Sequence, residues 1–190
     1  MSLTRGLAVL TMIAGLAAAQ GQAPQAAAKG TPSFLGPCST LTCEIQNDWQ
    51  RNNVVLYMLA GAMPPDKYAF KPVPEEQSFG ERVMHVAQVN LSLLKTLGAK
   101  APAPTIDDKA TSKTEAMAAL QKVGEYGVTV IREFGDQGLG TRVDSPFFMG
   151  PMATRQRILY FLMTHSQDTY GQLVVYLRLN GITPPLSRQP

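Results

Sequence analysis

Apolar side chains recur at intervals of three, four or seven residues along four stretches of the chain, a spacing typical of amphipathic helices. The first stretch, for example, carries Ile45, Trp49, Leu56 and Ala60 on one side. No segment shows a convincing alternation of apolar and polar residues, so no strand is expected. The predicted helices cover residues 44–62, 78–97, about 111–134 and about 152–180. The pattern therefore predicts an all-α fold, a single-domain four-helix bundle with long loops.

Capping and helix-breaking residues mark most of the predicted helix ends. Ser78 and Glu81 have the spacing of a capping box at the start of the second helix. Pro64 and the proline after it end the first helix, and Gly181 is expected as the C-cap of the fourth. The glycine-rich stretch 135–150 is expected to be a loop.

Two glycines, Gly124 and Gly127, interrupt the third predicted helix. They lower its intrinsic helix propensity, because glycine loses more backbone freedom on folding than other residues. They also leave room for a neighbouring helix to approach closely at this point.

The first 36 residues are predicted to be a signal peptide and a linker. Residues 1–19 combine a basic start at Arg5, a short apolar run and a small-residue end, the pattern of a cleaved secretory signal. An uncleaved membrane anchor is the alternative, although the run is short for a bilayer span. Residues 20–36, rich in Gln, Ala, Gly and Pro, are expected to form a flexible linker, and 37–190 the folded domain. The protein is therefore expected to be exported, either to the periplasm or as a secreted protein.

Composition excludes several classes of protein without selecting an activity. The 190 residues include 45% hydrophobic and 16% charged side chains and carry a net charge of +3. Such a chain is too apolar for a disordered protein and too short for two ordinary domains. Its basic residues are scattered, so no nucleic-acid partner is expected. No window approaches the length of a membrane span, so no membrane association is expected after signal cleavage.

The two cysteines, Cys38 and Cys43, are separated by four residues. In an oxidising compartment a pair this close most simply forms a structural disulfide. A redox pair and a metal-thiolate site are the alternatives, but redox pairs usually have two intervening residues and no second thiol pair exists here.

The two histidines of the chain, His85 and His165, fall on the second and fourth predicted helices. Neutral imidazole is the commonest metal ligand, and helix bundles build metal sites from side chains on facing helices. The alternative is that the two side chains are unrelated and satisfy local hydrogen bonds.

Several segments of the chain resemble the DinB-like superfamily, a set of four-helix bundles regarded as metalloproteins. The matching segments are 63–72, 78–81, 85–90, 165–178 and 180–185. They occur in family order and span essentially the whole predicted domain. The resemblance implies a four-helix bundle, a small-molecule ligand in the bundle pocket and a homodimer.

The resemblance also implies a divalent metal, zinc or nickel, held by three histidines. His85 and His165 match two of the three positions, but the third is occupied by Thr169. A threonine hydroxyl is a poor substitute for imidazole. The neighbouring Asp168 is a further candidate ligand, although it lies about 100° around the helix from position 169. We therefore expect a degraded metal site that binds weakly or not at all.

Characterised relatives in this superfamily include thiol-dependent S-transferases and isomerases. The resemblance thus implies a metal-dependent transferase or hydrolase, and the alternative is a non-catalytic, metal-free exported bundle that binds a ligand or partner. No nucleophile elbow, P-loop or dinucleotide-binding turn is present in the sequence. No catalytic residue can be assigned from the sequence beyond the two histidines.

Overall fold

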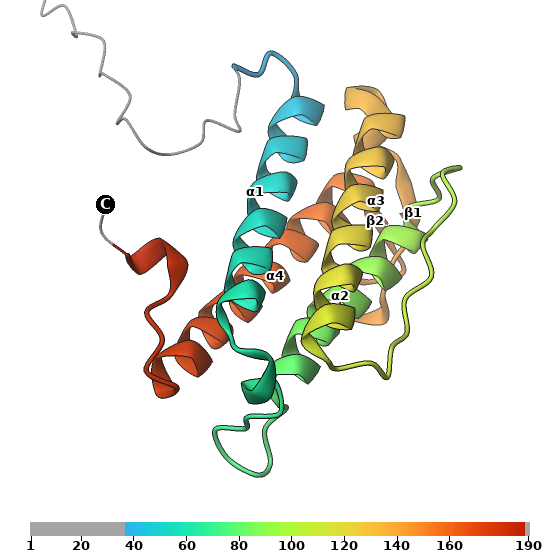
Figure 1. Ribbon diagram of the computed structural model, residues 1–190. Helices are drawn as coiled ribbons and strands as arrows, with labels where there is room; N and C mark the ends of the chain where they lie inside the picture. The colour runs from blue at the N-terminus through green and yellow to red at the C-terminus, as the bar shows by residue number, and fades with distance from the viewer. Residues whose placement is uncertain (1–36, 189–190) are drawn as a thin grey trace, which may run out of the picture. The chain divides into compact units, whose positions relative to one another are not determined.

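The computed structural model describes residues 37–188 (Figure 1). Its long helices are α1 (Leu41–Ala62), α2 (Phe79–Thr96), α3 (Lys113–Leu139) and α4 (Arg155–Leu179). The described part of the chain is a four-helix bundle, as predicted. The predicted signal peptide (1–19) and linker (20–36) lie outside the described residues. Within 37–188, no helix has both the length and the apolar character needed to cross a bilayer.

The order of the helices in the bundle explains the long connections between them. α1 packs against α3 and α4, and α2 packs against the same two helices. Arg155, at the start of α4, donates to the carbonyl of Leu97 at 2.8 Å and to that of Gly138 at 3.2 Å. The ends of α2 and α3 therefore meet, so these two helices run parallel. The segment 97–112 between them has to return along the bundle (Figure 1).

A hydroxyl caps the start of every long helix in the described residues. In each case the side chain accepts a hydrogen bond from the backbone N–H three residues further on, which satisfies one of the free donors of the first turn. The N-cap residues are Thr40, Ser78, Ser112 and Thr154. The capping box predicted from the sequence is present: Ser78 Oγ accepts from the Glu81 N–H, and Glu81 Oε2 accepts from the Ser78 N–H at 2.6 Å.

The structure corrects the loop predicted over residues 135–150. α3 continues to Leu139 through a kink at Gly135, whose φ of 59° lies in the left-handed region that glycine adopts readily. Two antiparallel strands follow, β1 (Arg142–Asp144) and β2 (Met152–Thr154), with the 3-10 helix η2 (Phe147–Met149) between them. Each strand has three residues, too few to show an alternating pattern. Because Thr154 caps α4, that helix begins at Arg155 and not near residue 152.

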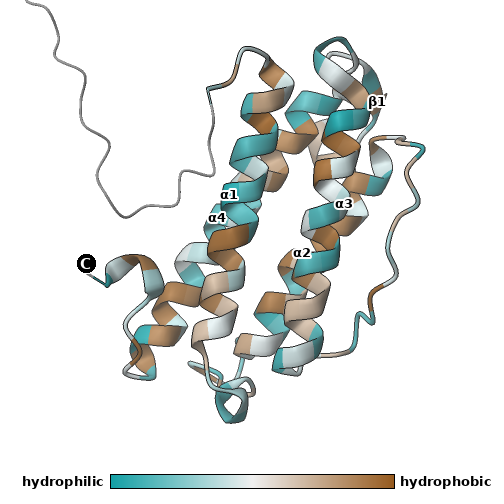
Figure 2. Ribbon diagram, turned by 45° about the horizontal axis from the view of Figure 1, so that its top comes forward, coloured by the Kyte–Doolittle hydropathy of each residue, from teal (hydrophilic) through white to brown (hydrophobic). Residues whose placement is uncertain are grey.

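Two further 3-10 helices, η1 (Pro65–Lys67) and η3 (Pro185–Ser187), follow α1 and α4. All four long helices carry hydrophobic and hydrophilic positions along their length (Figure 2). Their buried apolar side chains form one continuous core. This arrangement is the one that amphipathic helices adopt when they bury one face and hydrate the other.

α1 and α3 approach each other closely at the two glycines of α3, as the sequence suggested. Trp49 of α1 is 1% exposed, and its Nε1 donates to the Gly124 carbonyl at 2.9 Å. A Cβ atom at Gly127 would lie 2.3 Å from Cε2 of the Trp49 ring. Only glycine can occupy position 127 without moving the indole.

The start of α1 is fixed by a disulfide and by a carboxylate from α3. Cys38 and Cys43 form the disulfide expected from their spacing, with Cα atoms 5.5 Å apart. The kink at Gly135 is followed by Asp136, whose carboxylate accepts from the Thr42 N–H at 2.7 Å and from the Thr42 hydroxyl. An acidic group is favourable there, because the first turn of a helix presents unpaired N–H groups.

Candidate functional site

The two histidines lie side by side on facing helices. His85 on α2 and His165 on α4 place their Nε2 atoms 3.4 Å apart, with ring centroids at 5.3 Å and an angle of 60° between the rings. Two nitrogens that share one zinc ion at about 2.0–2.1 Å in tetrahedral geometry are about 3.4 Å apart. The separation of the two Nε2 atoms therefore suits two ligands of a single ion.

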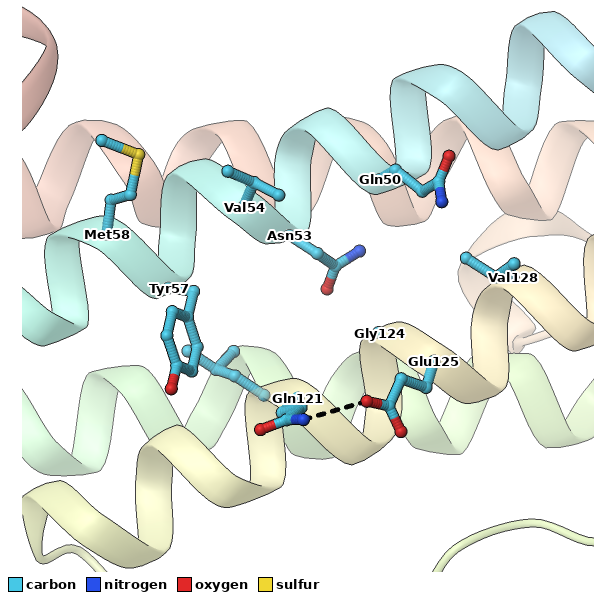
Figure 3. A pocket seen from close by; sticks show the side chains of 10 residues that line it. Gln50, Asn53, Val54, Tyr57, Met58, Gln121, Gly124, Glu125 and Val128 are labelled. Carbon is cyan, nitrogen blue, oxygen red and sulfur yellow. Dashed lines mark hydrogen bonds between the residues drawn. The ribbon is translucent and has the colours of Figure 1, made fainter. Parts of the chain in front are cut away.

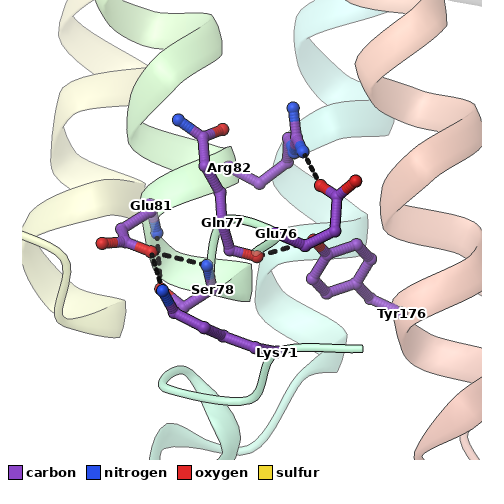
Figure 4. A network of polar contacts seen from close by, with 7 residues as sticks. All are labelled: Lys71, Glu76, Gln77, Ser78, Glu81, Arg82 and Tyr176. Carbon is purple, nitrogen blue, oxygen red and sulfur yellow. Dashed lines mark hydrogen bonds and ion pairs between the residues drawn. The ribbon is translucent and has the colours of Figure 1, made fainter. Parts of the chain in front are cut away.

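Contacts near both ends of α2 and α4 bring the histidines into register. At one end, the guanidinium of Arg155 holds the Leu97 carbonyl. At the other end, the Tyr176 hydroxyl donates to the Gln77 carbonyl at 2.6 Å (Figure 4). The helices run antiparallel between these two contacts, and the imidazoles meet between them.

A network of polar contacts fixes the first turn of α2, immediately before His85 (Figure 4). Arg82 Nη2 donates to Glu76 Oε2 at 2.7 Å, and Lys71 Nζ lies 3.7 Å from Glu81 Oε2. Arg82 lies three residues before His85, on the same side of the helix. Its guanidinium therefore contributes a positive charge close to the imidazoles.

The surroundings keep both imidazoles in the neutral form. Burial is the main cause that lowers the pKa of His85 and of His165. The charge of Arg82 lowers both pKa values further, and His85 lowers that of His165, while Asp168 acts in the opposite direction on His165. A neutral imidazole has the free lone pair that metal binding requires.

The two candidate positions for a third ligand do not complete the site. Thr169, one turn after His165, is buried with 1% of its surface exposed. Asp168 is exposed, and its carboxylate accepts a hydrogen bond from Gln172 Nε2 at 2.8 Å. Within residues 37–188, no group of three or more His, Cys, Asp or Glu side chains is placed to hold a metal ion. The structure thus brings His85 and His165 together and does not join Asp168 to them.

The hydrogen bonding of His165 also differs from that of a histidine in a complete metal centre. Metal-binding histidines usually donate their other ring N–H to a carboxylate or a carbonyl, which orients the ring. His165 Nδ1 is buried and has no hydrogen-bond partner among the described residues. The two Nε2 atoms therefore fit part of a metal coordination shell. The hydrogen bond that orients the other ring nitrogen in tightly binding metal sites is missing at His165.

The histidines line a pocket of about 790 Å³ between α2, α4 and the segment that joins β1 to η2. The lining side chains are His85, Val89, Ser92, Leu93, Thr96, Asp144, Ser145, Pro146, Phe147, Phe148, Phe161 and His165. Asp144, Phe147 and Phe148 are not among the site residues expected from the sequence, because a loop is predicted over residues 135–150. The adjacent phenylalanines within a stretch rich in Gly and Pro were the signal that could have drawn attention to it.

A separate groove of about 560 Å³ lies between α1 and α3 (Figure 3). Tyr57 lines this groove and is 41% exposed. The charged side chain of the groove, Glu125, accepts a hydrogen bond from Gln121 at 3.0 Å. This groove contains no pair of groups comparable to the two histidines, so the histidine pocket is the candidate site.

Comparisons with known proteins define the class to which this bundle belongs. The family model of the DinB superfamily matches residues 48–173. The chain therefore belongs to the DinB superfamily, as its motifs indicated. No curated protein sequence matches the chain.

Two solved structures share the fold. A DinB-like protein from Bacillus cereus superposes with a TM-score of 0.67 at 21% sequence identity, covering 77% of this chain and 96% of that one. A DinB-like protein from Bacillus subtilis superposes with a TM-score of 0.60 at 19% identity, covering 77% of this chain and 99% of that one. At these identities the similarity establishes the fold.

Proposed function

We propose that this DinB-superfamily protein is exported and binds a divalent transition metal, zinc or nickel, weakly and reversibly through His85 and His165. The observation that carries the proposal is the 3.4 Å separation of the two Nε2 atoms. It matches two ligands of one ion, and the neutral state of both rings leaves their lone pairs free. Export is supported by the signal-like segment 1–19 and by the disulfide near the start of α1.

The expected weakness of binding follows from the donors around the pair. Two imidazoles leave at least two positions of a tetrahedral ion to water or to a ligand. Thr169 supplies no imidazole. A metal held at this site would act as a Lewis acid and lower the pKa of a bound thiol or water, which is the chemistry of the S-transferase relatives.

The residues of the chain would perform three separate tasks in such a protein. His85 and His165 bind the metal ion, while Arg155 and Tyr176 keep α4 in register with α2. The apolar side chains of the pocket exclude water from the ligand.

Zinc titration by calorimetry tests the proposal. Untagged wild-type protein should bind about one equivalent of zinc and release it on dialysis. Both His85→Ala and His165→Ala should abolish the heat of binding, whereas Gln156→Ala, on the first turn of α4, should leave it unchanged. The same heat in either histidine variant as in wild type would contradict the proposed ligands.

A metal-free bundle that binds a ligand or partner is the second candidate function. The unpaired His165 Nδ1 favours it, because a ring intended for tight metal binding would normally be oriented by a partner at this atom. Absence of any zinc binding by wild-type protein, together with retained ligand binding in the pocket, would select this alternative.

A further inference from the structure

Two phenylalanines at the rim of the histidine pocket are left exposed to solvent. Phe147 is 94% exposed and Phe148 is 53% exposed, and both line the pocket. A contiguous exposed apolar patch can mark a site where a ligand or a partner binds.

The segment that carries these rings is anchored on both sides, so its backbone is held at the rim of the pocket. Ser145 Oγ donates to the Gly150 carbonyl at 2.6 Å, and Arg157 Nη1 donates to the Met149 carbonyl at 3.3 Å. The Met149 side chain is buried, and the strands β1 and β2 pair on either side of the segment. The fold thus orders this segment and still leaves the two rings uncovered.

The rings continue inward as a row of aromatic side chains that ends at a histidine. Phe147 and Phe148 have centroids 5.6 Å apart, and Phe148 lies 5.0 Å from Phe161 of α4. Phe161 in turn stacks on His165 at 6.3 Å with an angle of 22°. These separations are in the range at which aromatic rings attract one another. An aromatic ligand entering the pocket could therefore make the same kind of contact with these rings.

The size and charge of the pocket limit which small molecules it can bind. A volume of about 790 Å³ is within the range of small-molecule sites. Asp144 is the one acidic side chain of the lining, no Lys or Arg side chain lines the pocket, and the nearby Arg82 guanidinium is already paired with Glu76 at 2.7 Å. The Ser92 hydroxyl can donate to or accept from a neutral polar substituent, whereas the Thr96 hydroxyl donates to the Leu93 carbonyl at 2.8 Å and is left to accept.

We infer that the pocket binds an uncharged aromatic small molecule, with its ring packed against Phe148 and Phe161 and its polar end toward the histidines. This inference rests on the proposed function in that it assigns the ligand of the same site. Phe147, at the rim of the pocket, offers the same ligand a second aromatic contact.

Fluorescence titration with N-phenyl-1-naphthylamine, an uncharged aromatic probe, tests the inference. Wild-type protein should bind one equivalent with a saturable rise in emission. Phe148→Ala should weaken binding about tenfold, since it removes a ring that would stack on the probe. Phe147→Ala should weaken binding about threefold, and this exposed position carries little risk to folding.

Two controls make the test specific. Tyr57→Ala removes an exposed ring from the groove between α1 and α3 and should leave the affinity unchanged. The sulfonated analogue of the probe, 8-anilino-1-naphthalenesulfonate, should bind at least tenfold more weakly because of its negative charge. Equal binding of the two probes, or loss of binding in Tyr57→Ala but not in Phe148→Ala, would overturn the inference.

The outcomes separate this inference from the metal proposal. Zinc binding without saturable probe binding would refute the aromatic ligand and leave the metal site intact. Probe binding without zinc binding would refute the metal site alone. Light scattering on Phe147→Ala tests whether the exposed ring instead belongs to an interface between two copies of the chain. If this variant dissociates a dimer that wild type forms, while both bind the probe equally, the rim is an interface between copies and the inference is wrong.

Discussion

His85 and His165 are only partly buried, yet their surroundings favour the neutral form of both rings. Burial lowers both pKa values, and the positive charge of Arg82 acts in the same direction. Arg82 is itself paired with Glu76, so burial remains the main cause. The site therefore combines a favourable protonation state with only two imidazole donors, which is consistent with weak and exchangeable metal binding.

At the same scale, Gly127 should tolerate no side chain. Gly127→Ala places a methyl group 2.3 Å from the Trp49 ring, and we expect a loss of about 1–3 kcal/mol in the free energy of unfolding. Urea denaturation of the wild type and the variant measures this loss.

Gly171→Ala is the matched control for this substitution. Gly171 is exposed in α4 with no atom within 4 Å of the added Cβ, so the same change should stabilise the protein by up to about 1 kcal/mol. Equal effects of the two substitutions would show that α1 and α3 do not approach closely at Trp49.

At the scale of elements, the start of α2 determines where His85 lies. Hydrogen bonding from the backbone N–H of Ser78 is the main cause that lowers the pKa of the Glu81 carboxyl, and the Ser78 hydroxyl and Lys71 add to the effect. A carboxyl whose pKa is lower in the folded state stabilises the protein above its unfolded pKa. That contribution is lost as the pH falls through the folded pKa.

Glu81→Gln should therefore reduce stability more at pH 7 than at pH 3. The carboxylate is largely exposed, so the difference should be a few tenths of a kcal/mol after solvent screening. Ser78→Ala removes the hydroxyl that accepts from the Glu81 N–H, and should cost about 1 kcal/mol at pH 7. Urea denaturation at the two pH values checks both variants. A larger effect of Glu81→Gln at pH 3 would contradict the role of the charged carboxylate.

The elements also show which parts of the site could be predicted from the sequence. Apolar spacing and caps located all four long helices, and therefore placed His85 and His165 on two of them. The register that makes the rings meet depends on Arg155 and Tyr176, whose partners lie 58 and 99 residues away in sequence. The rim of the pocket was missed, because strands of three residues leave no periodic signal.

At the scale of the whole molecule, export remains to be tested. The mature protein from its native host should begin near Gln20, and N-terminal sequencing would show it. An intact Met1 end on cytoplasmic protein would contradict export.

The same mature protein should contain the Cys38–Cys43 disulfide. Mass spectrometry should then show a gain of about two hydrogens on reduction. Two thiols that react with an alkylating agent before reduction would contradict an oxidised pair.

We propose that the fold presents two of the three ligands of a metal site, with Thr169 at the position of the third. Thr169→His adds an imidazole one turn from His165, on the same face of α4. Thr164→His, at an exposed position of the same helix, is the matched control. His85→Ala in the Thr169→His background removes the ligand contributed by α2.

Thermal unfolding of these variants over a range of zinc concentrations is the most direct measurement. A ligand that binds only the folded state at 100 times its Kd stabilises by about 2.7 kcal/mol, or roughly 5–10 °C in Tm for a domain of this size. We predict such a rise for Thr169→His at zinc concentrations that barely affect wild type or Thr164→His, and its loss when His85 is also replaced. A Tm of folded Thr169→His that responds to zinc no more than wild type, or a wild-type protein that keeps one equivalent of metal through dialysis, would contradict the claim.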